Sequence, residues 1–326
     1  MIWDGRTMAG KPFPPRGYAT FRIRIFTGQS TPVLSLKISD IISAYRLWIN
    51  GRLASAAGTP GTDYQSEIPR QDFHLVQVIN DRPVLEILLQ VSNQHYRHGG
   101  VTSAIQLGSS HDIHRRQHIR WAIALFLIGS LVIMGTYHIL IFLLRPEDAS
   151  PLYCGLYSLL WSVNALASPT ADWFIHQLHP GIPWTLLYRI DLVSAYFSCA
   201  VILYFLHSLY PQEISLRACR LIFTVAVGFT LMTAVLPIRW FSGIVPIFFV
   251  ITFLYIVYMS IAITIAVRRK RPVALIILTG VGFLFVTGAN DMLHDTNIIH
   301  TAYIMPLGVF AFILCQCWAL SVKFTG

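Results

Sequence analysis

A polar segment between Asn93 and Gly100 contains side chains suited to holding a small polar molecule. It offers amide, imidazole, phenol and guanidinium groups beside two adjacent glycines. A sugar needs such hydrogen-bonding groups and an aromatic ring on which to rest, and Trp48 or Tyr64 could supply the ring. The alternative is a polar turn that satisfies the ends of its own strands. The candidate ligand-binding residues are Trp48, Asn93, His95, Tyr96, Arg97 and His98.

Five other polar residues lie inside or at the ends of long apolar segments: Asn164, Arg189, Asp191, Asn290 and Asp291. Ionisable groups in a bilayer are costly unless they are paired or hydrated, so we expect a polar layer in the outer part of a helix bundle. Arg189 and Asp191 are two residues apart and do not face each other on a helix. We therefore expect Arg189 to pair with Asp291, or otherwise with Asp191. The alternative is that these groups reach into the lipid headgroups.

Several histidines are candidates for metal ligands or proton carriers. His111, His114 and His118 would share one face of a helix, but no carboxylate or cysteine at matching positions completes a zinc site. A basic helix beside the membrane is the preferred interpretation. His138 and His207 are interpreted as packing residues with hydrogen bonds. We predict no metal, no cofactor and no catalytic residue, since no phosphate-binding loop or hydrolase motif is present.

The composition is that of a membrane protein. Of the 326 residues, 55% are hydrophobic and only 12% are charged, and the mean hydropathy is +0.58. In the second half, the basic residues behind the net charge of +9 lie mainly beside apolar runs, which argues against a nucleic-acid partner. All five cysteines lie in or at the ends of apolar runs, so no disulfide framework is expected.

Seven apolar segments are predicted to cross the membrane. Basic residues distinguish their two ends: one set of connections contains Arg145, Arg217, Arg220, the run from Arg268 to Arg271, and Lys323, whereas the other contains only Arg239. The positive-inside rule places the N-terminal part outside the cytoplasm and the C-terminus inside, although Arg115, Arg116 and Arg120 flank the first span on the outer side. The predicted spans are about 119–144, 152–169, 185–207, 219–237, 241–267, 273–291 and 302–322.

The segment before the spans has the pattern of a β-sandwich. Apolar and polar residues alternate with a period of two, as in Phe21, Ile23 and Ile25 with arginines between them. Asn50-Gly51 predicts a tight hairpin turn. Several short strands punctuated by Gly and Pro favour two packed sheets.

Three motifs followed by seven spans resemble a known family: GYATFRIRI from Gly17, SAYRLWINGR from Ser43 and VSNQHYRHGG from Val91. The resemblance is to the bacterial seven-transmembrane receptors with diverse intracellular signalling modules. It implies an ectodomain of that family's second type, a jelly roll similar to carbohydrate-binding modules. Family members usually begin with a signal peptide and further strands and continue into a histidine kinase, a diguanylate cyclase or a phosphatase. We therefore expect this chain to be truncated at both ends.

The predicted organisation is an extracytoplasmic β-sandwich over residues 1–110, a juxtamembrane linker at 111–118, a seven-helix bundle at 119–322 and a cytoplasmic stub at 323–326. The expected function is that of a non-enzymatic receptor in the bacterial inner membrane. Expected partners are a small-molecule or glycan ligand, the lipid bilayer, a second copy in a homodimer, and a cytoplasmic signalling module. A transporter or channel is the main alternative, and an intramembrane enzyme using His138 or Asp191 is a weaker one.

Overall fold

The computed structural model describes residues 7–8, 11–12, 14–27, 33–38, 41–78, 83–97, 99–101, 104–168, 174–179, 181–295, 298–299, 301 and 303–325. These residues belong to two compact units. The β unit comprises Met1–Ala122, Ala171–Leu187 and Leu236–Gly243, and the helical unit comprises Ile123–Thr170, Tyr188–Val235 and Ile244–Gly326.

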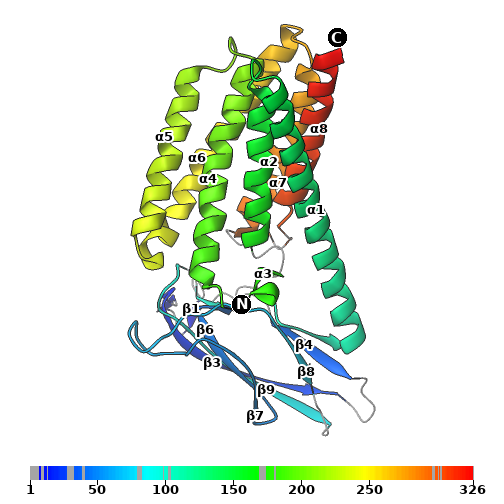
Figure 1. Ribbon diagram of the computed structural model, residues 1–326. Coiled ribbons are helices and arrows are strands. Elements are labelled where there is room, and N and C mark those ends of the chain that lie inside the picture. The colour runs from blue at the N-terminus through cyan, green and yellow to red at the C-terminus, as the bar shows by residue number, and fades with distance from the viewer. Residues whose placement is uncertain are drawn as a thin grey trace. The chain divides into compact units, whose positions relative to one another are not determined.

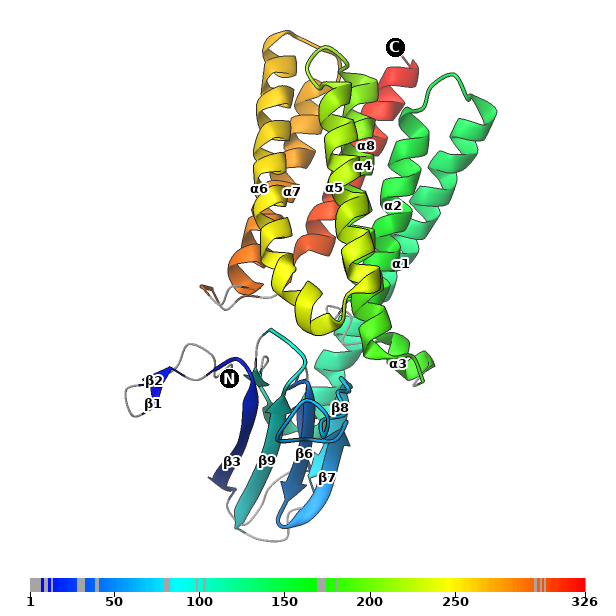
Figure 2. The same ribbon diagram turned by 90° about the vertical axis from the view of Figure 1, so that its left-hand side faces the viewer.

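Two antiparallel sheets form the core of the β unit, which confirms the predicted β domain. Leu36 and Ile38 from one sheet and Leu47 and Leu89 from the other lie in one buried cluster. Figure 2 shows the four strands of the larger sheet side by side. The larger sheet has the order β3 (Gly17–Phe26), β9 (Val84–Asn93), β6 (Ala44–Ile49), β7 (Arg52–Ala57), and the smaller has β11 (Gln106–Ser109), β4 (Leu34–Ile38), β8 (His74–Val78). Two short pairs complete the described strands: β1 (Thr7–Met8) with β2 (Lys11–Pro12), and β5 (Ile41–Ile42) with β10 (Gly100–Val101).

The predicted hairpin turn joins β6 to β7. Asn50 has φ 50° and Gly51 has φ 80°, and a turn with two positive φ angles matches the twist of the flanking strands. The Asn50 side chain also accepts a hydrogen bond from the Glu86 N–H at 2.9 Å. The turn is therefore tied to the neighbouring strand β9 as well.

The strand predicted from the alternation around Phe21, Ile23 and Ile25 is observed as β3, but its apolar face is only partly covered. Among the described strands, β3 lies at the edge of its sheet and pairs with β9 alone. Phe21 and Ile25 pack against the core, whereas the side chain of Ile23 is 56% exposed. An edge strand has a neighbouring strand on one side only. The alternation of apolar and polar residues therefore predicts which face of the sheet a side chain lies on, but not how deeply it is buried.

Six of the described helices are long and apolar enough to cross a membrane. The helix α2 is not among them: it has 18 residues and buries several polar ones, including Ser158, Ser162 and Asn164. Figure 1 shows the long helices side by side in one bundle. The helices are α1 (Ser110–Leu144), α2 (Ser150–Ala167), α3 (Phe174–Leu178), α4 (Trp184–Leu209), α5 (Leu216–Val235), α6 (Ile238–Arg268), α7 (Ala274–Asp295) and α8 (Met305–Thr325).

The short helix α2 packs closely against its neighbours inside the bundle. A Cβ placed on Gly155 of α2 would lie 2.8 Å from the carbonyl oxygen of Gly135 in α1. Small residues at such a crossing let two helix backbones approach closely in a membrane. A helix enclosed by others need not be apolar on all faces, which explains why its composition differs from that of the six others.

Residues 111–118, the predicted juxtamembrane linker, form the first turns of α1. The Ser109 hydroxyl accepts the N–H of Asp112 at 3.1 Å and so caps the helix start. From β4, the buried Lys37 donates to the Gln117 side chain at 2.8 Å. The β unit therefore includes the beginning of α1.

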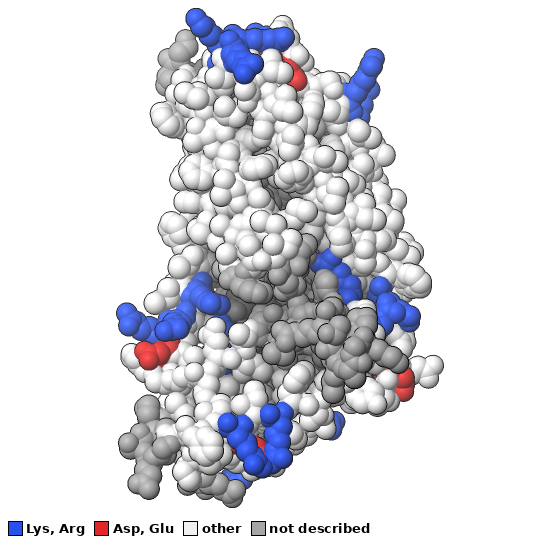
Figure 3. All heavy atoms as spheres, turned by 180° about the vertical axis from the view of Figure 1, so that it is seen from behind, with Lys and Arg blue, Asp and Glu red and all other residues white. Residues whose placement is uncertain are grey.

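Basic residues gather at the end of the helical unit where α6 ends and α7 begins (Figure 3). Arg269 and Arg271 share the carboxylate of Glu213, at 3.1 and 3.0 Å, and so connect two interhelical segments. Burial alone would raise the pKa of Glu213, but the hydrogen bonds from the two arginines outweigh it and lower the pKa. These charges lie where the sequence analysis expects the cytoplasmic side.

Candidate functional site

The turn after β9, where the ligand residues are predicted, is held by Asn93. This side chain is fully buried. Its amide donates to the carbonyl oxygens of Pro15 at 2.9 Å and Tyr96 at 3.0 Å, and its oxygen accepts the Tyr96 N–H at 2.9 Å. These bonds fix the shape of the turn, so Asn93 serves the framework of this region.

A buried carboxylate, Glu67, fixes the other side of the same turn. One of its oxygens accepts hydrogen bonds from the His95 ring at 3.0 Å, from the Gln94 N–H at 3.2 Å and from the hydroxyl of Ser43. Its second oxygen is buried without a hydrogen-bond partner among the described residues. Glu67 lies in an irregular connection with no periodicity, so no pattern in the sequence points to it.

The connection between β7 and β8, residues 58–73, brings an aromatic ring to the turn. The ring of Tyr64 lies on the ring of His95, with 4.2 Å between centroids and an interplanar angle of 32°. Tyr64 is 46% exposed, so part of its ring is accessible to a ligand. Of the two rings considered in the sequence, Tyr64 is the one that lies beside the turn.

Trp48 lies elsewhere on the sheet. It pairs with Leu88 in β9, five residues before Asn93, which corresponds to about 17 Å along a strand. The structure therefore brings Asn93, His95 and Tyr96 together but places Trp48 apart from them. Arg97 follows in the same turn and is partly exposed, and His98 lies outside the described residues. A ligand-binding role for this set remains a prediction.

The same β7–β8 connection touches two helices at their first turns. The Trp184 indole of α4 donates to the carbonyl oxygen of Pro69 at 3.3 Å. The guanidinium carbon of Arg239, in α6, lies 5.8 Å from the centroid of the Tyr64 ring, within cation–π range. Trp184 and Arg239 belong to the β unit, although their helices continue into the helical unit. No local sequence pattern connects them with a segment more than 110 residues earlier.

In the helical unit, Asn164 and Asp191 connect α2 to α4. The Asn164 amide donates to the Asp191 carboxylate and to its backbone carbonyl oxygen, both at 2.8 Å. A buried carboxylate is retained in such a place only if it has hydrogen-bond donors. These two members of the predicted polar layer therefore contact each other directly.

Asp291 has a different role from the predicted one. Its carboxylate accepts the N–H groups of Ile304 at 2.8 Å and Met305 at 3.0 Å, at the start of α8, and the side-chain amide of Asn290 at 2.9 Å. Arg189 donates instead to the carbonyl oxygen of Ala234 at the end of α5. The expected Arg189–Asp291 pair is not formed, because Asp291 caps the helix that follows it.

Four of the histidines named in the sequence, His114, His118, His138 and His207, make ring contacts or hydrogen bonds. His114 and His118 lie on one helical face, with ring centroids 6.3 Å apart. Among the described residues, no group of three or more metal-ligating side chains is arranged to hold an ion. The His138 ring bonds the Met134 carbonyl oxygen at 2.9 Å, and the His207 ring bonds that of Ile214 at 2.7 Å.

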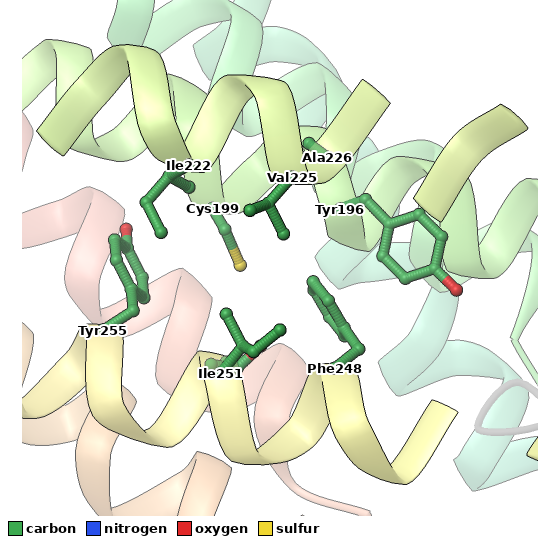
Figure 4. Close-up of a pocket in the computed structure, with 9 residues that line it drawn as sticks. Tyr196, Cys199, Ile222, Val225, Ala226, Phe248, Ile251 and Tyr255 are labelled. Carbon is green, nitrogen blue, oxygen red and sulfur yellow. The ribbon is translucent and has the colours of Figure 1, made fainter. Parts of the chain in front are cut away.

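A small pocket lies between α4, α5 and α6 (Figure 4). Cys199 points into the space between Val225 of α5 and Ile251 of α6. The hydroxyls of Thr252 and Tyr255 are buried and have no partner among the described residues. The lining is mostly apolar and aromatic, and it contains no charged side chain. The lining residues are Tyr196, Cys199, Ile222, Val225, Ala226, Phe248, Ile251, Thr252 and Tyr255.

The pairing in the helical unit can be tested by double-mutant cycles on detergent-purified protein. For Arg189→Leu and Asp291→Asn, we expect additive changes in thermal stability, within about 0.5 kcal/mol, because the two groups have separate partners. Asp291→Asn alone should cost about 1 kcal/mol through the weakened cap. For Asn164→Ala and Asp191→Ala, we expect a coupling of about 0.5–3 kcal/mol. Equal coupling in both cycles would contradict the structural assignment.

Comparison with known proteins completes the description. The family profile described as 7TM diverse intracellular signalling matches residues 120–323, which is more than half of the chain. A search of curated proteins with this chain found no match. The matched region contains the helices α2 to α7 in full and most of α1 and α8. The chain therefore belongs to the 7TM diverse intracellular signalling family of membrane sensory receptors.

Proposed function

We propose that this protein is a bacterial inner-membrane receptor whose β unit lies outside the cytoplasm, binds a polar small molecule or glycan fragment, and transmits binding to the helices. A ligand can do so only by favouring one of two helix arrangements. A cytoplasmic signalling module would receive the change beyond α8. The family membership supports the sensory role, and the geometry of the β unit supports the route.

One observation carries the proposal: a single connection contacts both the predicted ligand turn and two helix starts. The β7–β8 connection holds the turn through Glu67 and His95, reaches α4 through Pro69 and reaches α6 through Tyr64. A ligand that contacts Tyr64 would therefore touch a residue in direct contact with Arg239. This is a short physical path from a binding site to a membrane helix.

Binding is tested by a thermal-shift screen of the full chain in detergent against sugars, cell-wall fragments and other polar molecules. With the ligand so found, Tyr64→Leu should weaken binding by about tenfold, because a buried aromatic contact contributes about 1–2 kcal/mol. Tyr18→Leu is the matched control, since Tyr18 is an exposed tyrosine of β3. If Arg97→Ala and Tyr64→Leu both bind as tightly as wild type, the turn is not the site.

Orientation is tested by labelling with a membrane-impermeant maleimide in intact cells. Ala56→Cys in β7 and Arg217→Cys in α5 introduce thiols at exposed positions. We expect Ala56→Cys to react in intact cells and Arg217→Cys to react only after lysis, as the basic end should be cytoplasmic. The wild-type protein is the control for its five native cysteines. The reverse pattern would contradict the proposed topology.

A further inference from the structure

A cleft lies between the smaller sheet of the β unit and the first turns of α1. Its volume is about 290 Å³, close to the lower end of the range of about 300–1,000 Å³ for sites that hold small molecules. All its described lining residues precede Ala122 and therefore belong to the β unit, and none of them is part of the predicted ligand turn. They are Lys37 of β4, Gln106 of β11, and Ile113, Arg116, Gln117, Ile119 and Arg120 of α1.

One face of α1 forms the helical wall of the cleft. Arg116, Gln117 and Arg120 follow Ile113 by three, four and seven residues, which is the spacing of side chains on a single helical face. Ile113 and Gln117 are buried, so this is the face turned towards the sheet. The guanidinium groups of Arg116 and Arg120 therefore enter the cleft from successive turns of one helix.

A buried lysine contributes the charge of the opposite wall. Lys37 is 4% exposed. Its Nζ atom donates to the side-chain oxygen of Gln117 at 2.8 Å and lies 5.3 Å from the centroid of the Phe73 ring. An ammonium group taken out of water is stable only where such contacts surround it. These contacts hold the charge of Lys37 at a fixed place in the wall.

The cleft is strongly positive. Its described lining includes three basic residues and no acidic one, and Figure 3 shows basic side chains gathered where α1 begins. Asp112, in the first turn of α1, does not line the cleft, and its carboxylate accepts a hydrogen bond from the Ser109 hydroxyl at 2.9 Å. A concave site lined by charges of one sign concentrates ions of the other sign.

We propose that this cleft binds the phosphate group of an anionic phospholipid. Guanidinium groups bind phosphate through charge-assisted hydrogen bonds, and an ammonium group binds it as a compact charge. The position in the chain indicates a lipid as the source. Ile119 lines the cleft and is 49% exposed, and the apolar run of the first membrane-span candidate begins at Trp121. Basic residues directly before such a run lie at the level of the headgroups.

This site also accounts for an exception in the charge pattern of the spans. Arg115, Arg116 and Arg120 flank the first span on the side where the positive-inside rule predicts few basic residues. Two of these three arginines line the cleft. A lipid phosphate would supply the negative charge for Arg116 and Arg120 at that place.

The test is native mass spectrometry of the full chain, purified in detergent and titrated with phosphatidylglycerol. Diacylglycerol with the same acyl chains is the control without phosphate, and glycerol 3-phosphate is the soluble form of the same chemistry. We expect the wild type to bind phosphatidylglycerol saturably and to bind no diacylglycerol. Binding of glycerol 3-phosphate without phosphatidylglycerol would contradict the lipid source and assign the cleft to a soluble phosphorylated molecule.

Three variants of equal charge change locate the site. Arg116→Gln and Arg120→Gln should each weaken binding of phosphatidylglycerol by about tenfold. Arg115→Gln is the matched control and should leave binding unchanged, because Arg115 neighbours Arg116 but does not line the cleft. All three arginines are exposed, so the thermal midpoint without lipid should change little in each variant.

Two results would overturn the inference. An equal loss of binding in Arg115→Gln would show a diffuse attraction between anionic lipid and a basic helix. Equal binding of diacylglycerol and phosphatidylglycerol, or no binding of either lipid or of glycerol 3-phosphate, would show that the cleft holds no phosphate group.

The outcome is separate from that of the proposed function. If phosphatidylglycerol binds and maleimide labelling places the β unit in the cytoplasm, the phosphate site stands and the extracytoplasmic sensor is wrong. If phosphatidylglycerol does not bind and a sugar binds in a Tyr64-dependent way, the phosphate site is wrong and the sensory role stands.

Discussion

The buried carboxylate of Glu67 is the contact on which the organisation of the β unit depends. A carboxylate removed from water is stable only when donors surround it, and here the donors are the Gln94 N–H and the His95 ring in the turn after β9, and the hydroxyl of Ser43. This requirement fixes the β7–β8 connection against the turn. Once it is fixed, Pro69 and Tyr64 are held at the first turns of α4 and α6. The route from the proposed ligand site to the helices therefore follows from satisfying one charge.

In the helical unit, two carboxylates also need hydrogen-bond donors, and they obtain them from other kinds of group. Asp191 is satisfied by an amide from α2, and Asp291 by the unpaired backbone N–H groups that every helix start presents. Each carboxylate thus fixes one helix relative to another. A change in the position of α7 would therefore alter the hydrogen bonds of Asp291 to the start of α8, the last helix of the bundle.

Local chemistry made part of this structure predictable. The Asn50-Gly51 turn needs two positive φ angles, which few residue pairs tolerate, and the long apolar runs can be stable only in a membrane or a buried core. The span predicted at 152–169 corresponds to α2 (Ser150–Ala167), whose buried polar side chains composition does not reveal. The helical spacing of His111, His114 and His118 is visible in the sequence, but the burial of Gln117 against Lys37 of β4 is not.

The site was harder to predict because it depends on contacts between distant segments. Depth along a helix places Arg189 and Asp291 in one layer, but the direction in which each side chain points depends on helix rotation. Likewise, Asn93 and His95 have the chemistry of a ligand site, yet the structure uses Asn93 for the turn itself. Arg239 and Glu67 carry no local signal at all. Their contacts form only when the turn after β9, the β7–β8 connection and the start of α6 are brought together.

The central claim is that the state of the β unit is transmitted through the β7–β8 connection to α4 and α6. The most direct measurement is amide hydrogen exchange on the full chain in nanodiscs, with and without a saturating ligand, compared for peptides covering 184–195, 238–250 and 216–228. The account predicts that ligand slows exchange at the starts of α4 and α6, leaves α5 unchanged, and loses this effect in Tyr64→Leu at equal occupancy. Protection confined to the strands and the turn, with no change at 184–195 or 238–250, would contradict it.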